Sequence, residues 1–280
     1  MPSRTIGHYP SDLTDAQWEH IRHVLPKAKH GGRPRTTNIR RVVNAIFFLN
    51  RTGCAWRYLP TTFPPWKTVH HYFCTWQKLG IWKKLNDRLV RRVRAKFQKT
   101  PFPTCTIVDS QSVRASHGSD RGYDGFKRLR GRKRQILVDT LGLLHSVRVH
   151  AADRADTQEA HNLYDTCPKR KLRSLRIIYA DLGYRGRFVE ETNRILGFRP
   201  TLPDKHPNDK QGVPRRYKDK LKRELRGITK KRWIVERTFS WFNHYRRLSK
   251  DYERKPENST AMIYLAMTQL LLRRWERKCS

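Results

Sequence analysis

The run KRQILVDTLGLLHSVRVHAAD, residues 133–153, constrains the fold more than any other part of the chain. Two stretches of β-branched and apolar residues flank a short turn at Thr140–Gly142, a pattern typical of a β-hairpin. A hairpin with so much apolar surface must join a larger sheet and be covered by another layer. The chain is therefore predicted to contain a β-sheet with flanking helices.

The segments around this hairpin predict which elements complete the sheet. Strands are predicted for TCTIVDSQ, RIIYADLGYRG and FRPTLP. Helices are predicted for DTQEAHNLYDT, RFVEETNRILG, the run from residue 232 and STAMIYLAMTQLLLRRW. The order is strand, hairpin, helix, strand, helix, strand and two helices. This order predicts an α/β class with a mixed sheet over residues 101–280.

The first hundred residues have helical periodicity instead. LTDAQWEHIRHVLP begins with a capping pattern at Thr14, and IRRVVNAIFFLNRTG is an amphipathic helix that ends at Gly53. Two more helices follow the prolines of TTFPPW. Several short helices with exposed cations predict a small all-α, helix-turn-helix-like DNA-binding domain at residues 1–100. A helical bundle without any DNA role is the alternative.

Charge indicates the kind of partner. The chain has 61 Lys and Arg against 24 Asp and Glu, a net charge of +37, and self-repulsion of this size would destabilise the fold unless a polyanion neutralises it. Double-stranded DNA is the expected partner. No apolar run approaches the roughly 18 residues that span a bilayer, so no membrane partner is expected.

Cysteine usage indicates the compartment. The five cysteines are scattered and lack any CxxC pair, which argues against a zinc finger and a disulfide scaffold. A reduced, cytoplasmic location is expected. Residues 204–227 are polar and basic, and we expect an exposed loop there.

Three acids stand next to apolar runs. Asp109 ends TIVD, Asp181 ends IIYAD, and Glu236 follows WIV. Functional groups collect beyond the carboxyl ends of strands in such sheets, so the two aspartates are expected to meet there, with Glu236 brought to them by a helix. Carboxylates in a group of three are suited to Mg²⁺.

Each acid also has an ordinary structural interpretation. A lone Asp after a strand is commonly a turn or cap residue, and Glu236 can pair with Arg232 one helical turn earlier. Asp139 follows an apolar run as well, but TLG marks a hairpin there, so we interpret it as a turn residue. Only the combination of three acids is specific.

The chain resembles the bacterial insertion-sequence transposases of the IS-five family, within the DDE transposase superfamily. The matching stretches run in order from residue 12 to about 275 and include GCAWRYLP, FPPWKTVHHYFCTW, TIVDSQSVRA, YADLGYRG and RWIVERTFSWFNHYRRLSKDYE. The family signature around the third acid has Arg232 in place. This chain departs from the fuller family signature at two positions. It has Thr229 where the family has Tyr, and Asn243 where the family has Lys or Arg.

This resemblance implies an RNase H-like catalytic fold with Asp109, Asp181 and Glu236 as a DDE triad that holds two Mg²⁺ ions, with Mn²⁺ as a substitute. It implies an N-terminal domain that recognises the terminal inverted repeats of the element. The implied chemistry is end cleavage followed by transfer of the freed 3′-OH into target DNA, without a covalent protein intermediate. Synapsis of two ends implies a homodimer or larger assembly, and the expected location is the bacterial nucleoid.

Basic residues near these motifs are predicted to contact DNA. They fall in a GGRPR motif similar to an AT-hook, in the helix after FPPW, in KRLRGRKR, and after Glu236. The candidates are Arg33, Arg35, Lys67, His70, Lys78, Lys127, Arg128, Arg130, Arg132, Lys133, Arg237, Arg246, Arg247 and Lys250. Solvated loop charge is the alternative for KRLRGRKR.

Two other functions remain open at this point. A Mg²⁺ nuclease that does not transpose would need the same acids, and strand joining distinguishes the two. A DNA-binding regulator derived from a transposase would be expected to have lost an acid, and all three are present.

Overall fold

The computed structural model describes residues 9–28, 31, 34–118, 120–202 and 232–276. Its named α-helices are α1 (Asp15–Ile21), α2 (Ile39–Thr52), α3 (Trp66–Lys78), α4 (Ile81–Lys96), α5 (Asp156–Glu159), α6 (Lys169–Ser174), α7 (Arg187–Leu196) and α9 (Pro256–Glu276). A further helix covers residues 232–242. The predicted exposed loop at 204–227, together with Arg33 and Thr229, lies outside the described residues.

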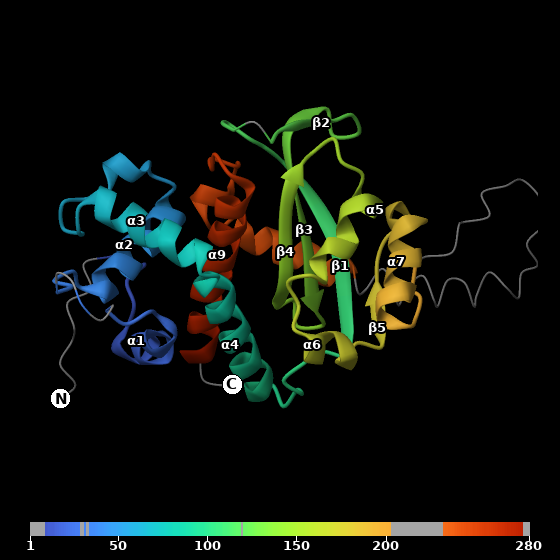
Figure 1. Cartoon of the computed structure of the whole chain (residues 1–280), viewed down its shortest axis with the longest axis horizontal. Coiled ribbons are helices and arrows are strands. Elements are labelled where there is room, and N and C mark those ends of the chain that lie inside the picture. The colour runs from blue at the N-terminus through green and yellow to red at the C-terminus, as the bar shows by residue number, and fades with distance from the viewer. Residues whose placement is uncertain (1–8, 29–30, 32–33, 119, 203–231, 277–280) are drawn as a thin grey trace, which may run out of the picture.

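The elements are arranged in layers (Figure 1). Helices α1, α2 and α3 lie on one side, α4 and α9 run side by side next to them, and the sheet follows. The short helices α5 and α6, together with α7, cover the other face of the sheet. The molecule is thus a mixed α/β structure with a helical N-terminal region, as the sequence predicts.

The N-terminal helices follow from local sequence signals. Thr14 accepts a hydrogen bond from the N–H of Gln17, and the Gln17 side chain accepts one from the N–H of Thr14, which completes the predicted capping box of α1. Helix α2 ends at Gly53, whose φ of 76° lies in the left-handed region. A β-carbon at Gly53 would lie 3.0 Å from that of Arg246, so a close approach also favours glycine here.

The sheet has five strands: β1 (Cys105–Arg114), β2 (Gly122–Asp124), β3 (Leu129–Asp139), β4 (Leu144–Ala151) and β5 (Ile177–Tyr179). Its order is β2-β3-β1-β5, and β4 also pairs with β3. Strand β3 is antiparallel to β1, β2 and β4, whereas β5 is parallel to β1. This mixed order agrees with an RNase H-like domain, and the predicted hairpin is β3–β4.

Two expectations about strands are wrong. β1 does not end at Asp109 but continues to Arg114, because β3 is long enough to pair with it as far as Gly131. The segment FRPTLP is not a strand, since Thr201 forms only an isolated bridge with Tyr179. Asp109 therefore lies in the middle of its strand.

The two faces of the sheet bury different cores. Ile107, Ile136 and Val138 face the main core, which also contains α9, the helix at 232–242 and the N-terminal helices. Val108 and Leu137 alternate with them and face a second core beneath α7. Because α9 contacts both α4 and β4, the N-terminal helices and the sheet share one core. The division at residue 100 stays a prediction.

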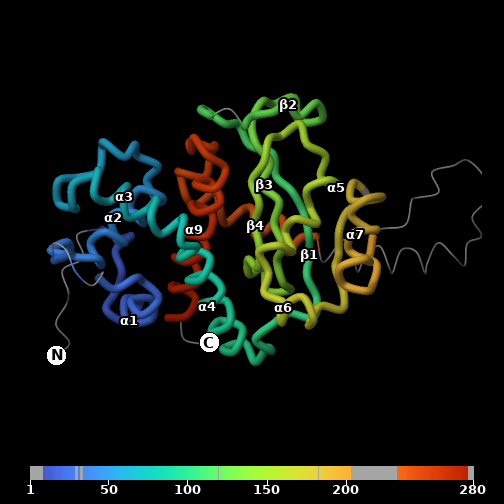
Figure 2. The backbone as a smooth tube through the Cα atoms, in the orientation of Figure 1, coloured from blue at the N-terminus to red at the C-terminus, as the bar shows by residue number. Residues whose placement is uncertain are grey.

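The chain reverses direction after the helix at 232–242. The segment RRLSK was expected to continue that helix for about three turns, but the helix ends at Phe242 and a turn follows at residues 243–244. A short 3-10 helix, η5 (Arg246–Leu248), then leads to α9. The tube drawing shows how α9 then runs beside α4 through the middle of the molecule (Figure 2).

Among the described residues, none of the helices has the length and apolarity needed to cross a bilayer.

Candidate active site

Asp109 lies on β1, and Asp181 lies two residues beyond the end of the neighbouring strand β5. β1 and β5 are parallel, and Ile107 pairs with Tyr179. Each aspartate lies two residues beyond its member of that pair, and side chains two residues apart on a strand share a face. Asp109 therefore lies on the face of Ile107, which is the face that the helix at 232–242 covers.

The environment of Asp109 opposes its ionised form. Its carboxylate is half-buried, and the N–H of Ser110 donates to Oδ1 at 2.8 Å. Burial is the main cause that raises the pKa of Asp109 to about 6, and the charge of Asp181 raises this pKa further, against the lowering effects of the Ser110 N–H and of Arg232. A carboxylate whose pKa is raised in this way is typical of sites that bind a cation or a proton.

A short turn fixes Asp181. The N–H of Gly183 donates to Oδ1 of Asp181 at 2.9 Å, and the N–H of Tyr184 donates to its main-chain oxygen at 3.2 Å. A β-carbon at Gly183 would lie 3.1 Å from Oδ1, so the absence of a side chain leaves room for the carboxylate. The Tyr184 ring is buried and meets Phe188 edge-on at 5.3 Å, which anchors the turn.

Glu236 projects from the helix at 232–242 and is more exposed than the two aspartates. Val235, Phe239 and Phe242 bury one face of this helix in the main core. The Glu236 side chain is 58% exposed and lies 4.0 Å from the Arg232 guanidinium. Trp233 was expected to dock the helix, but it is 57% exposed and stacks under Arg237 at 4.7 Å, because it falls outside the helical spacing of the buried residues.

The structure thus brings two of the three predicted acids together. Within its described residues, no three His, Cys, Asp or Glu side chains lie close enough to hold a metal ion. Asp109 and Asp181 nevertheless fit a divalent cation, because both are hard oxygen donors and the pKa of Asp109 is raised by burial and, to a smaller extent, by the charge of Asp181. Arg232 acts electrostatically on Asp109 and also pairs with Glu236, so it links the third acid to the pair.

The raised pKa of Asp109 predicts a pH-dependent stability. The pKa of Asp109 is about 6 in the folded protein, against an ordinary value of 3.8. In the absence of metal, the fold therefore loses stability as the pH rises from about 4 to about 6 and Asp109 becomes ionised. The variant Asp109→Asn should therefore unfold with a free energy about 2 to 3 kcal/mol larger than wild type at pH 8 and equal to it below about pH 4. Urea unfolding at several pH values measures this difference. Added Mg²⁺ should stabilise wild type at pH 8 and leave Asp109→Asn unchanged; equal stability of both proteins at pH 8 would contradict the prediction.

Most of the predicted DNA-contacting residues are accessible. The exposed ones are Arg35, Lys67, Lys78, Lys127, Arg128, Arg130, Arg246 and Lys250, and the partly buried ones are His70, Lys133 and Arg237. Arg237 donates to the main-chain oxygen of Leu141, and Lys133 lies 3.4 Å from Asp156. These residues remain candidates for DNA contact.

Arg132 and Arg247 are buried and are no longer candidates for DNA contact. Arg132 is fully buried on β3, pairs with Asp251 at 3.2 Å and donates to the main-chain oxygens of Glu253 and Arg254. Arg247 is buried as well and pairs with Glu253 at 2.7 Å. Residues 251–254 cover both arginines and satisfy their charge, so the prediction of DNA contact was wrong for these two.

The neighbouring Arg134 belongs to the same buried group. It donates to the main-chain oxygens of Leu248 and Lys250, and its complete burial lowers the pKa of its guanidinium to about 10. Arg132 and Arg134 together hold the segment after the Glu236 helix against β3. The sequence analysis missed this role, because the partners of both arginines lie more than a hundred residues further along the chain.

Comparison with known proteins agrees with this architecture. Residues 100–271 match the family described as "Transposase DDE domain", and residues 13–86 match the family described as "Putative transposase of IS4/5 family". The chain therefore belongs to the DDE transposases, a class of enzymes that cut DNA and transfer its strands, and within them to the insertion-sequence group.

Individual relatives point the same way. The chain is 26% identical to a "Putative transposase for insertion sequence element IS402" from Burkholderia cepacia, over 48% of this chain and 60% of that protein. It is 31% identical to an "Insertion element IS402 uncharacterized 16.2 kDa protein" of the same species, over 37% of this chain and 73% of that protein. It is 29% identical to "Uncharacterized protein y4sN" from Sinorhizobium fredii, over 37% and 76%. No solved structure gives a significant match.

Proposed function

We propose that the chain binds the terminal inverted repeats of an insertion sequence and catalyses Mg²⁺-dependent cleavage and strand transfer into target DNA. Asp109, Asp181 and Glu236 are the proposed catalytic and metal-binding residues. The observation that supports this most is the pair of aspartates, each two residues beyond the paired Ile107 and Tyr179 of parallel β1 and β5, with the pKa of Asp109 raised by burial and by the charge of Asp181. Family membership supports the reaction type.

The proposed roles follow from where the acids lie. Asp109, on the central strand, is placed to hold a cation jointly with Asp181, whose turn keeps its carboxylate in a fixed orientation. Bound Mg²⁺ supplies Lewis-acid stabilisation of charge on the phosphodiester oxygens. Glu236 completes the site when its side chain leaves Arg232, and Arg232 is then free to pair with a DNA phosphate.

The proposed partners are double-stranded DNA and a second copy of this chain. The net charge of +37 supports double-stranded DNA as the ligand, and the exposed cations of α3 support an N-terminal DNA-binding domain at residues 1–100 that precedes the catalytic domain at 101–280. Joining two transposon ends requires at least a homodimer. A protein with this ligand would act at the bacterial nucleoid.

The test uses the purified full chain and a duplex that carries the flanking inverted repeats. With Mg²⁺ or Mn²⁺, we expect nicks at the ends of the element and covalent joining of the ends to a second, labelled duplex. With Ca²⁺, we expect binding without nicks. Nicks without joining would indicate a Mg²⁺ nuclease, and binding without nicks in Mg²⁺ would indicate a regulator; either result would contradict the proposal.

A further inference from the structure

A second candidate site, lined mainly by positively charged side chains, lies at the base of the sheet. A cavity of about 470 Å³ opens between α4, the segment before β1 and the start of α6. Its lining includes the cations Lys84, Arg91, Lys169, Arg170 and Lys171, which we call the basic cleft. Phe102 and two prolines provide its apolar wall.

The single carboxylate in this lining is already neutralised. Asp87 pairs with Lys83 at 2.5 Å and with Lys171 at 3.2 Å. Lys171 is 4% exposed and also donates to the main-chain oxygen of His145, so it is fixed at the bottom of the cleft. The cleft therefore keeps an excess of positive charge.

The cations at the mouth are free to bind. Lys84, Lys169 and Arg170 are exposed, and none of them pairs with an acid among the residues that the structure describes. They come from α4 and α6, which are separate in sequence but meet here. Cations that converge on a concave, partly apolar surface concentrate the field and attract anions more strongly than cations scattered on a convex surface.

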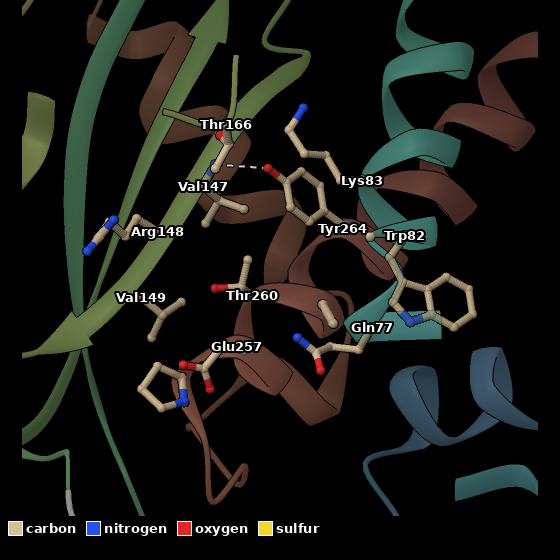
Figure 3. A pocket seen from close by; sticks show the side chains of 13 residues that line it. Gln77, Trp82, Lys83, Val147, Arg148, Val149, Thr166, Glu257, Thr260 and Tyr264 are labelled. Atoms are coloured by element: carbon tan, nitrogen blue, oxygen red, sulfur yellow. Dashed lines mark hydrogen bonds between the residues drawn. The ribbon is translucent and has the colours of Figure 1, made fainter. Parts of the chain in front are cut away.

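A second cavity differs in charge. It measures about 390 Å³ and lies between β4, α9 and the start of α4 (Figure 3). Its lining includes Glu257 as well as Lys83, and Arg148 there pairs with Glu159 at 3.3 Å. Tyr264 accepts a hydrogen bond from the N–H of Val147 across its floor. The excess of unpaired cations thus distinguishes the basic cleft from this second cavity.

The lining indicates which anion fits. A volume of about 470 Å³ exceeds that of a single phosphate, and the apolar wall suits a sugar between two phosphates. The lining offers few acceptors for base edges, because Asp87 is engaged and the Nε2 of His145 contacts Asp139 at 3.1 Å. These features favour a sugar-phosphate backbone held without regard to sequence.

We infer that the basic cleft binds the backbone of duplex DNA, apart from the catalytic carboxylates and independently of sequence. This inference rests on the proposed function, which supplies DNA as the ligand. The segment at Phe102 precedes Cys105, and Asp109 lies four residues, about 13 Å, further along β1. One turn of duplex DNA is about 34 Å long, so a single duplex is long enough to reach both places.

The test is the double variant K169E/R170E of the full chain. The matched control is R194E/R199E, which makes the same change of charge at two exposed arginines that lie outside the proposed N-terminal DNA-binding domain and outside the lining of the cleft. Binding of two duplexes of unrelated sequence is measured by fluorescence anisotropy across a series of salt concentrations. We expect K169E/R170E to bind both duplexes at least tenfold more weakly and to lower the salt slope by about 2, since each lost phosphate contact removes about 0.9.

The outcomes separate the inference from the proposed function. Equal binding by K169E/R170E and the control, while wild type still cuts end DNA, would overturn the cleft alone. A wild type that binds no duplex would overturn DNA as the partner and the proposed function with it. Displacement of the cleft-dependent binding by inorganic pyrophosphate at constant ionic strength would indicate a free polyphosphate site instead. If K169E/R170E fails to fold by circular dichroism, K169Q/R170Q replaces it, with half the change in charge.

Discussion

Asp109→Asn is expected to reduce Mg²⁺-dependent end cleavage by about a thousandfold or more and to leave the affinity for end DNA unchanged. Asparagine keeps the shape of the side chain but removes the charge that a divalent cation needs, and the loss of several kcal/mol of charge stabilisation corresponds to three or more powers of ten in rate. The side chain is half-buried on β1, so the substitution should not disturb packing. Nicking of labelled end DNA in single-turnover conditions measures the rate, and a filter-binding assay measures the affinity.

Asp181→Asn and Glu236→Gln should have effects of the same order. The matched control is Asp165→Asn, which removes an exposed carboxylate whose nearest cation, Arg148, is 4.0 Å away. Glu236→Gln is the more demanding variant, because Glu236 stands apart from the aspartate pair in the structure. Cleavage by Glu236→Gln at the rate of Asp165→Asn would remove Glu236 from the catalytic site and leave the two aspartates.

Asp139→Ala should lower the free energy of unfolding by about 3 to 5 kcal/mol, because it leaves a buried cation without its partner. The Asp139 side chain is fully buried and pairs with Arg94 of α4 and with Nε2 of His145 at 3.1 Å. Its other oxygen accepts from the N–H groups of Leu141 and Leu143 at 2.9 and 3.0 Å. Urea unfolding at pH 7 measures the loss.

A double substitution provides the control for this effect. Arg94→Met combined with Asp139→Asn removes both charges, keeps an oxygen that can accept from the turn, and should recover part of the lost stability. A loss below about 1 kcal/mol in Asp139→Ala would show that the pair is not a main support of the hairpin. Burial alone would raise the pKa of Asp139, but the hydrogen bond and charge of His145, followed by Arg94, hold this pKa below its ordinary 3.8. The stabilisation is therefore present above about pH 4 and lost as pH falls through the lowered value.

The Asp139 turn connects the helical region to the third acid. Arg94 ties α4 to the hairpin, and the same hairpin receives the helix at 232–242, where Thr238 donates to the main-chain oxygen of Gly142 at 2.9 Å. A β-carbon at Gly142, whose φ is 76°, would lie 2.9 Å from the side chains of Thr238 and Trp241. The position of Glu236 therefore depends on how the hairpin is held, and a weakened Asp139 contact should loosen it.

Sequence patterns found the elements of the fold because strand and helix periods differ. The interpretation of Asp139 as a turn residue was correct, since its side chain and main chain both bond to the turn that it begins. The patterns did not reveal that Asp139 also neutralises Arg94, which lies 45 residues earlier. Such pairs form only when the whole core has assembled.

The charge pattern was a poorer guide than the apolar pattern. KRLRGRKR looks uniformly basic, yet Arg128 and Arg130 are exposed whereas Arg132 and Arg134 are buried. A long cationic side chain is accepted in the interior only where carbonyl oxygens and a carboxylate surround it, and those groups come from residues 248–254. No local feature of KRLRGRKR announces partners so distant in sequence.

By itself, the sequence indicated most of the elements, their order and three candidate acids, because apolar periodicity and turn residues act over a few neighbouring positions. Only the tertiary structure decided that Asp109 lies in mid-strand beside Asp181, that Glu236 remains exposed next to Arg232, and that the cations of α4 and α6 converge in one cleft. Burial and electrostatic environment depend on groups that are remote in the chain and meet only after folding, so no local pattern encodes them.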